Sequence, residues 1–300
     1  MRLLPHIRLL VTHPGGSHRD EWLGCALILG RLLEQGIRPS ALPSIERREP
    51  TSADLADSGV WVLDIGGVHD ADKGNFDHHQ FTIEDTSKHP RCTFSLILEY
   101  LGCIDDMASL LPWVSYSAAA DCLGREQAAA TLGIPAEAVS ATESPIESGM
   151  LSQFSRVQSL AASDPLHIVM SETGQYLLGQ AARLRDRVSL LEQQSEEILV
   201  HSHLVMLVDM PELQAPQFGL SQFRKRMLQR GVDVAAMVLP DSRGPGYILV
   251  RLHDAAPFDF RRLHGESETG FVHASGFLLA LRERPARDRL EALLCKAVGR

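Results

Sequence analysis

Aromatic residues and cysteines are scarce in this sequence, and each scarcity narrows the class of protein. Aromatic residues make up 6% of the 300 positions, which favours a small or short ligand over a long surface of stacked nucleobases. The five cysteines are odd in number and include no Cys-x-x-Cys pair. Neither a disulfide framework nor a thiolate zinc site is therefore expected, and this cysteine usage fits a reducing compartment.

Positive charge and long apolar runs are also scarce. The formal net charge of -9 argues against a large nonspecific nucleic-acid surface, which needs a basic stripe. The N-terminal apolar run is interrupted by Pro5, His6 and Arg8, and no stretch is long and apolar enough to cross a bilayer. We therefore expect no signal peptide, no membrane partner and a cytoplasmic location.

The apolar pattern predicts an α/β protein. Residues 7–11 and 60–63 are short apolar runs typical of buried strands, and residues 20–35 have helical periodicity that stops at Gly36. Strand, helix and strand at this spacing indicate a parallel sheet with helices on both faces. A second strand is expected within 37–48 and a surface excursion at 133–150. Further helices are expected at 52–58, 92–101, 105–120, 124–132, 151–163 and 174–200.

The pattern changes near residue 200, which predicts a second, smaller α/β domain. The expected division is an N-terminal catalytic domain over 1–175, a connecting helix over 176–200 and a substrate-binding domain over 201–300. The elements expected in the second domain are strands at 204–208, 234–239 and 247–252, and helices at 221–230 and 287–298.

His13, His18 and Asp20 lie within one tight turn after the first predicted strand. Gly15 and Gly16 permit such a turn because glycine tolerates positive φ. Asp20 could instead only cap the helix that it begins. The two imidazoles together with a carboxylate favour a metal site over an ordinary loop.

Asp64 ends the apolar run at 60–63. A carboxylate at the end of a buried strand is costly unless it is paired or binds a metal ion, and the alternative is a simple turn residue before Gly66 and Gly67. Since a carboxylate has two oxygens to share, we expect Asp64 to bridge two cations.

Asp77, His78 and His79 follow a turn at Gly74. Neighbouring rings in extended backbone point in opposite directions, so one of the two rings, His78 or His79, is expected to bind metal. The other would meet a phosphate oxygen or protonate the leaving group, and Asp77 would orient a histidine or bind metal weakly. Imidazoles and carboxylates at three strand ends suit a pair of divalent cations, which activate water for attack at phosphorus.

These segments occur in an order that resembles the DHH phosphoesterase superfamily. Within it the chain is similar to the melanocyte-proliferating-gene-one family, also labelled metal-dependent protein hydrolases. The matching motifs stand here at residues 12–21, 64–67, 76–80 and 271–277. Four motifs in order, spread over almost the whole chain, make a specific signal. The chain departs from the family pattern at Pro14, at Ser17 and at residues 278–280.

The resemblance implies a two-domain enzyme with its active site in the cleft between the domains. It implies phosphoester hydrolysis, with RNA-directed 3′-to-5′ exonuclease activity in eukaryotic relatives. A further motif of the superfamily, not among these four, supplies one more aspartate, for which Asp121 is the best match and Asp105 and Asp106 are the alternatives. The implied ligands of two ions, Mn²⁺ or Mg²⁺, are His13, His18, Asp20, Asp64, His78 and Asp121. Mixed imidazole and carboxylate ligands favour Mn²⁺, and Zn²⁺ is the further alternative.

The last motif would face substrate from the second domain. His273 is expected to join catalysis, and Ser275, Gly276 and Arg251 to bind substrate, although a buried strand with one satisfied histidine is the plainer alternative. The basic run at 224–230 fits either a phosphate grip or a solvated helix face.

The leading substrate is RNA or a short oligonucleotide. The alternatives are a small phosphoester such as a nucleotide or pyrophosphate, and a catalytically silent module that binds metal or nucleotide and regulates a partner. An oligomer is compatible with the sequence.

Overall fold

The computed structural model describes residues 1–82, 84, 90–141 and 144–299, and the chain separates into two compact units, Met1–Ala182 and Arg183–Arg300. Each unit contains one six-stranded sheet covered by helices. The predicted α/β class is therefore confirmed. None of the helices in the described part combines the length and the hydropathy needed to cross a bilayer.

The first unit is built on a mixed sheet with the order β4-β5-β3-β1-β2-β6. Its central strands are parallel, as predicted, whereas the edge strands β4 and β6 run antiparallel to their neighbours and were not anticipated. Its strands are β1 (Leu9–Thr12), β2 (Ser44–Arg47), β3 (Val60–Leu63), β4 (His69–Asp70), β5 (Asn75–Phe76) and β6 (Ser159–Leu160). Its helices are α1 (Arg19–Glu34), η1 (Pro39–Ala41), α2 (Ser52–Ala56), α4 (Thr93–Leu101), α5 (Ile104–Leu110), α6 (Pro112–Leu123), α7 (Arg125–Leu132), α8 (Ala136–Ala141), α9 (Pro145–Arg156) and α10 (Pro165–Gln194), which continues into the second unit.

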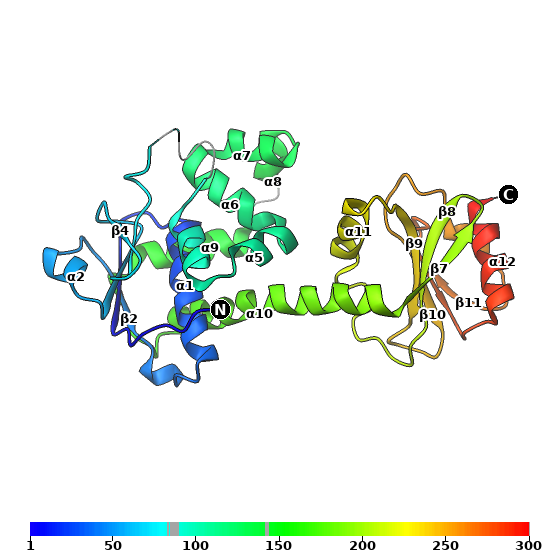
Figure 1. The fold of residues 1–300 in the computed structure, drawn as a ribbon, viewed down its shortest axis with the longest axis horizontal. Helices are drawn as coiled ribbons and strands as arrows, with labels where there is room; N and C mark the ends of the chain where they lie inside the picture. Colours follow the sequence, from blue (N-terminus) through cyan, green and yellow to red (C-terminus); the bar gives the residue numbers. More distant parts are fainter. Residues whose placement is uncertain (83, 85–89, 142–143, 300) are drawn as a thin grey trace. The chain divides into compact units, whose positions relative to one another are not determined.

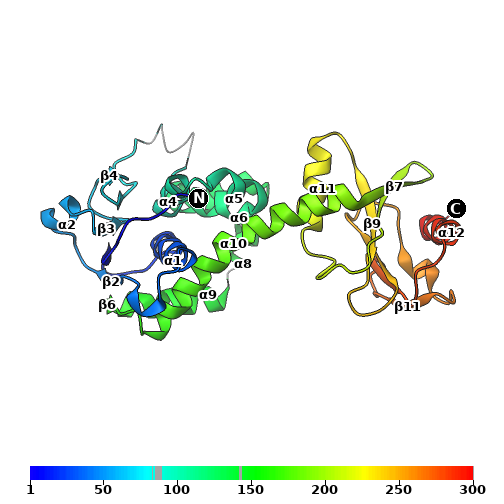
Figure 2. The same cartoon turned by 60° about the horizontal axis from the view of Figure 1, so that its bottom comes forward.

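Helices cover both faces of this sheet, as Figures 1 and 2 show for α1 and α2. Alternate residues of a strand point to opposite faces. Val11 and Val62 therefore share one face, where Leu55 of α2 packs against them. Trp61 points to the other face, where its ring meets that of Tyr100 in α4 at 5.5 Å.

Helices α1 and α10 cross at two glycines. A Cβ on Gly174 would lie 1.6 Å from the Ala26 carbonyl oxygen, and one on Gly30 would lie 2.2 Å from the Gln175 nitrogen. Any side chain at either position would force the two backbones apart. The crossing fixes α10 against α1, whose first turn carries Asp20.

The second unit has a mixed sheet with the order β11-β12-β10-β9-β8-β7, in which only the pair β8 and β9 is parallel among the described strands. One face packs on α12 and the other on α11 and the end of α10, and Figures 1 and 2 show α11 and α12 on opposite sides of β9. Its elements are β7 (Ser195–Val200), β8 (His203–Val208), α11 (Leu220–Gln229), β9 (Val234–Pro240), β10 (Tyr247–Arg251), η2 (Phe260–Leu263), β11 (Thr269–Val272), β12 (Leu278–Leu281) and α12 (Arg287–Val298).

Several stretches differ from the secondary structure predicted for them. The helix predicted at 151–163 ends at Arg156 and is followed by the strand β6, and the helix predicted from residue 174 begins at Pro165. The helix predicted to run to residue 200 ends at Gln194, and residues 195–200 form β7 because they pair antiparallel with β8. The surface excursion predicted at 133–150 contains α8 and the start of α9. Helix α9 begins after Ser144, whose side chain caps it by accepting the backbone N–H of Glu147.

Candidate metal centre

The parallel pairing of three strands brings three segments of polar side chains together. Thr12 of β1 is paired with Leu63 of β3, which is paired with Phe76 of β5. The residues just beyond these strand ends therefore lie side by side at one edge of the sheet. They include His13, Asp64 and His78.

Asp64 lies at the centre of this group and is 4% exposed. Its Oδ2 is 3.6 Å from Nε2 of His13, and its Oδ1 is 3.2 Å from Nε2 of His78. The backbone leaves β3 in the left-handed region at Asp64, with φ 59°, and its N–H donates to the Phe76 carbonyl at 3.0 Å. This conformation, which aspartate tolerates better than most residues, turns the carboxylate between the two histidines.

Asp20 is buried and is held by the start of α4. Its Oδ2 accepts the backbone N–H of Thr93 at 2.8 Å, and its Oδ1 accepts that of Phe94 at 2.7 Å. Burial and the nearby carboxylates of Asp121 and Asp64 raise the pKa of Asp20 to about 8. Such crowding of carboxylates is relieved by cations.

His78 joins Asp64 to Asp121 of α6. Its Nε2 is 3.1 Å from Asp121 Oδ2 and 3.8 Å from Asp20 Oδ2. Burial lowers the pKa of His78, but hydrogen bonds to Asp121 and Asp64 outweigh burial and raise it to about 12. Of the candidates for the additional aspartate, Asp121 thus lies at the cluster. The Asp105 side chain is exposed on α5, and the Asp106 side chain lies outside the described residues.

Asp77 and His79 form a separate pair beside the cluster. The His79 ring donates from Nδ1 to Asp77 Oδ1 at 2.7 Å, and the His79 backbone N–H donates to the same oxygen at 3.0 Å. Asp77 Oδ2 accepts the Gly67 N–H at 2.6 Å. Burial raises the pKa of Asp77, but the N–H groups of His79 and Gly67 outweigh it and the pKa is lowered. An ionised Asp77 therefore orients the exposed ring of His79.

Sequence reasoning missed Glu21 and Arg47. Glu21 is fully buried; its Oε2 accepts the Thr12 hydroxyl at 2.7 Å and lies 3.3 Å from Nε2 of His13. Its Oε1 pairs with Arg47 Nη2 at 3.1 Å. An acidic residue at position 21 and a basic residue at the end of a predicted strand, Arg47, could have suggested a buried ion pair. Glu21 is, however, also a common residue in the first turn of a helix.

The imidazole of His13 is set up to bind a cation. Its Nδ1 donates to the Pro14 carbonyl at 3.0 Å, so the neutral ring carries its lone pair on Nε2. That Nε2 is buried, has no hydrogen-bond partner and faces the carboxylates of Glu21 and Asp64. A lone pair directed at carboxylate oxygens is unfavourable unless a proton or a metal cation lies between them.

The described residues contain several groups of ligand atoms that could hold a metal ion, with the atoms of each group within 4.8 Å of one another. Asp64 belongs to two of them and so links the His13 side to the His78 side. His18 is exposed at the first group. Cys92 and Cys122 complete two groups and were not anticipated as neighbours. The groups are His13, His18 and Asp64; Asp64, His78 and His79; His78, Asp121 and Cys122; and Asp20, Cys92 and Asp121.

In the second unit the last motif forms a turn between β11 and β12. The His273 ring accepts at Nδ1 from the Ser275 hydroxyl at 2.8 Å, which leaves its Nε2 protonated when the ring is neutral. Gly276 has φ 73° and its N–H donates to the His273 carbonyl at 2.8 Å. Arg251 donates to the Phe258 carbonyl at 3.2 Å and to Asp254 at 3.0 Å.

The sheet and the cluster define an α/β protein with His and Asp groups suited to a metal site. Residues 9–100 match the model of MYG1_exonuc, described as "Uncharacterised protein family (UPF0160)". Over 75 residues the chain is 37% identical to "MYG1 exonuclease" of Rattus norvegicus, a stretch that covers 25% of this chain and 18% of the rat protein. These matches confirm the family resemblance drawn from the motifs: residues 9–100, which hold three of the four motifs, are similar to the MYG1 exonuclease family.

The chain also aligns with a solved structure whose title is "Crystal structure of Methanococcus jannaschii putative family II inorganic pyrophosphatase". The alignment covers 96% of this chain and 99% of that one, with 14% identity and a TM-score of 0.25. The α/β assignment rests on the two sheets described above.

Proposed function

We propose that this protein is a two-metal-dependent phosphoesterase that hydrolyses phosphodiester bonds. The observation that carries the proposal is the position of Asp64, whose two oxygens face His13 on one side and His78 on the other. A carboxylate shared in this way is the bridging ligand that a pair of cations requires. The unpartnered Nε2 of His13 and the crowded carboxylate of Asp20 support it.

His13, His18 and Asp64 would hold one ion, and Asp64, His78, Asp20 and Asp121 the other. Bound there, two divalent cations supply Lewis acidity and activate water near neutral pH. We propose Mn²⁺ rather than Mg²⁺, because Mg²⁺ prefers ligand shells made of oxygen alone.

His79 would act on the substrate rather than on the metal. Its ring is 64% exposed and is oriented by Asp77, so it can donate to a non-bridging phosphate oxygen or protonate the leaving group. The Nε2 of His273, protonated because Ser275 donates to Nδ1, offers a second donor of the same kind. We include Ser275, Gly276 and Arg251 as residues that support substrate binding.

The proposed substrate is RNA or a short oligonucleotide, cleaved from its 3′ end. The name of the rat relative supports exonuclease action. The acidic net charge of -9 supports a short substrate, because a long nucleic acid needs a basic track. A nucleotide or pyrophosphate substrate is the alternative within the same chemistry.

The test is hydrolysis of a 5′-labelled RNA oligonucleotide and of a nucleotide panel, with Mn²⁺ and with chelator. We expect a ladder that requires metal and that Asp64→Asn abolishes. Turnover of small phosphoesters alone would replace the exonuclease assignment with a metabolite phosphohydrolase. Stoichiometric metal without any turnover would make the protein a silent binding module.

A further inference from the structure

A polar hollow of about 550 Å³ opens beside the candidate metal centre within the first unit. Asp20, Asp121 and His18 lie at its wall, so a ligand in the hollow reaches the cluster. Arg19 and Arg125 supply cations to its lining, and several hydroxyl groups complete it. The hydroxyl-bearing residues are Ser17, Tyr116, Ser117, Ser144 and Ser148.

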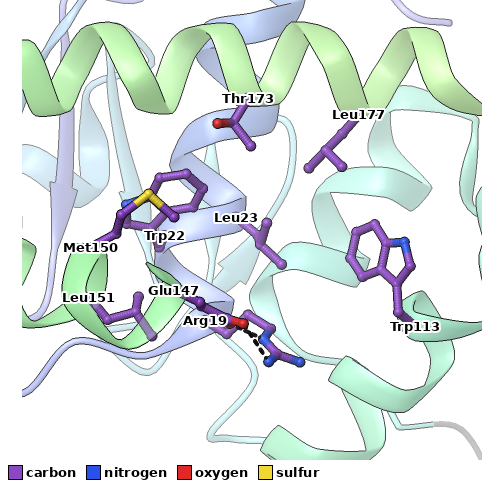
Figure 3. Close-up of a pocket in the computed structure, with 9 residues that line it drawn as sticks. All are labelled: Arg19, Trp22, Leu23, Trp113, Glu147, Met150, Leu151, Thr173 and Leu177. Carbon is purple, nitrogen blue, oxygen red and sulfur yellow. Dashed lines mark hydrogen bonds and ion pairs between the residues drawn. The ribbon is translucent and has the colours of Figure 1, made fainter. Parts of the chain in front are cut away.

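A second hollow of about 340 Å³ adjoins the first and is mostly apolar. Figure 3 shows it between α1, α6, α9 and α10, with Leu23, Trp113 and Leu177 around it and the Arg19–Glu147 ion pair at one side. The two hollows share four lining residues, which places them next to each other. The shared residues are Arg19, Trp113, Glu147 and Leu151.

Trp113 has a fixed orientation at the junction of the hollows. Its ring is stacked on that of Phe94, with 5.7 Å between centroids and 22° between planes. Phe94 also donates its N–H to Asp20. The half-buried indole therefore stands in a set position relative to the cluster, and a large, rigid aromatic ring of this kind suits a flat ligand.

The difference in polarity between the two hollows determines which way round a ligand binds. Glu147 is neutralised by its ion pair with Arg19, whereas Asp20 and Asp121 would repel an anion unless metal ions intervene, so a phosphate is directed to the metal end. The apolar hollow, in contrast, accepts an uncharged planar group. A nucleotide has this arrangement of groups: a charged phosphate, a sugar with hydroxyls and a flat base.

We propose that the two hollows bind one nucleotide unit, with its phosphate toward Asp20 and Asp121 and its base against Trp113. This inference rests on the proposed function and specifies its substrate. The combined size suits a small molecule, so the hollows would hold the end of a chain or a single nucleotide. The helices α6 and α9, which shape the hollows, lie outside the segment that matches the family model.

The test is calorimetric binding of adenosine monophosphate and of inorganic phosphate to the full chain with Mn²⁺. Because adenosine monophosphate contains no phosphodiester, the proposed phosphodiesterase should bind it without hydrolysing it. We expect the nucleotide to bind at least about ten-fold more tightly than phosphate. Trp113→Ala should weaken nucleotide binding about ten-fold to a hundred-fold, as loss of one base stack does, and leave phosphate binding within about two-fold.

Three further variants separate stacking from folding. Trp113→Phe keeps a ring on Phe94 and should retain most of the nucleotide affinity. Leu177→Trp fills the apolar hollow from α10 and should weaken nucleotide binding as Trp113→Ala does. Trp61→Phe is the control, because Trp61 is buried against Phe76 and Tyr100 and is not in the lining of either hollow.

The failures of the two proposals are distinguishable. Nucleotide that binds no more tightly than phosphate, or equally in wild type, Trp113→Ala and Leu177→Trp, overturns the inference even if RNA is hydrolysed. Nucleotide binding that depends on Trp113 without hydrolysis of RNA supports the inference and removes the exonuclease assignment.

Discussion

Arg47 and Glu21 form an ion pair in the interior of the first unit, with 3.1 Å between Nη2 and Oε1 and side chains that are 2% and 0% exposed. Arg47 also donates to the carbonyls of Gly15 and Phe154, at 3.1 and 2.9 Å. The pair therefore ties the turn after β1 to the end of α9. It also fixes the carboxylate that faces His13.

Glu21→Gln should lower the free energy of unfolding by about 3–5 kcal/mol, because it leaves the buried Arg47 cation without a counter-charge. Urea unfolding measures the change. The double variant Glu21→Gln/Arg47→Met should recover much of the loss. A double variant as unstable as the single one would show that the uncompensated charge is not the cause.

Asp64→Asn should lose at least about a thousand-fold in turnover and at least one bound ion, since an amide is a poor bridge between cations. Asparagine tolerates the left-handed φ of 59° at this position, so the melting temperature of the chelated variant should stay close to that of wild type. Metal content by mass spectrometry and turnover are measured together. Two retained ions with full activity would refute the bridging role.

Asp77→Asn should lower turnover about ten-fold to a hundred-fold, the usual effect of losing a residue that orients a site histidine. Metal content should be unchanged, because Asp77 contacts His79 rather than His13 or His78. An Asp77→Asn variant that loses metal would instead place Asp77 among the ligands.

Gly174→Ala should destabilise the first unit by about 1–3 kcal/mol, the usual cost of overpacking. Its Cβ would lie 1.6 Å from the Ala26 carbonyl oxygen, where backbone has to move. Gly149→Ala in α9 is the matched control: no atom lies within 4 Å of its Cβ, and alanine should stabilise the helix by about 0.5–1 kcal/mol. Equal melting temperatures for the two variants would contradict the close crossing.

Chelated protein should become less stable as pH rises from 5 to 8. Asp20 has a pKa of about 8 in the folded protein against 3.8 for the free side chain, and His78 about 12 against 6.5. The stabilisation from each bound proton is complete below the pKa of the unfolded group and is lost as pH rises through the folded pKa. Added Mn²⁺ should reverse the trend, because the cation replaces these protons.

That comparison needs thermal melts at several pH values with chelator and with Mn²⁺. The stabilisation by Mn²⁺ should be larger at pH 8 than at pH 6. A chelated protein whose melting temperature rises over this range would show that Asp20 and His78 are not protonated in the folded state.

Local pattern points to His13, Asp64 and His78 as candidate metal ligands, because each lies close after an apolar run or a glycine turn. The sequence predicts that these three residues lie close together, since parallel strands end at one edge of a sheet. Asp121 required the family resemblance, as a lone aspartate on a helix has no local signature. Glu21 could not be distinguished from a capping residue, because its partner Arg47 is 26 positions away in the chain.

The errors in secondary structure have the same origin. Residues 195–200 continue the charged and apolar alternation of the preceding helix, and only pairing with β8 makes them a strand. Ser144 and Pro145 resemble loop residues, yet they are also a helix cap and a first-turn proline, so the sequence 133–150 was taken for a surface excursion. The secondary structure of these two segments is therefore determined by long-range strand pairing and by helix capping.

The carboxylate of Asp20 accepts two amide hydrogens from a helix that begins 73 positions later in the chain. These bonds do not depend on a cation, so this side chain is ordered before any ion arrives. Uptake of metal would then need little rearrangement at this position. The amides of Thr93 and Phe94 would exchange slowly with heavy water in the chelated protein as well as in the loaded one, marking the site as preorganised.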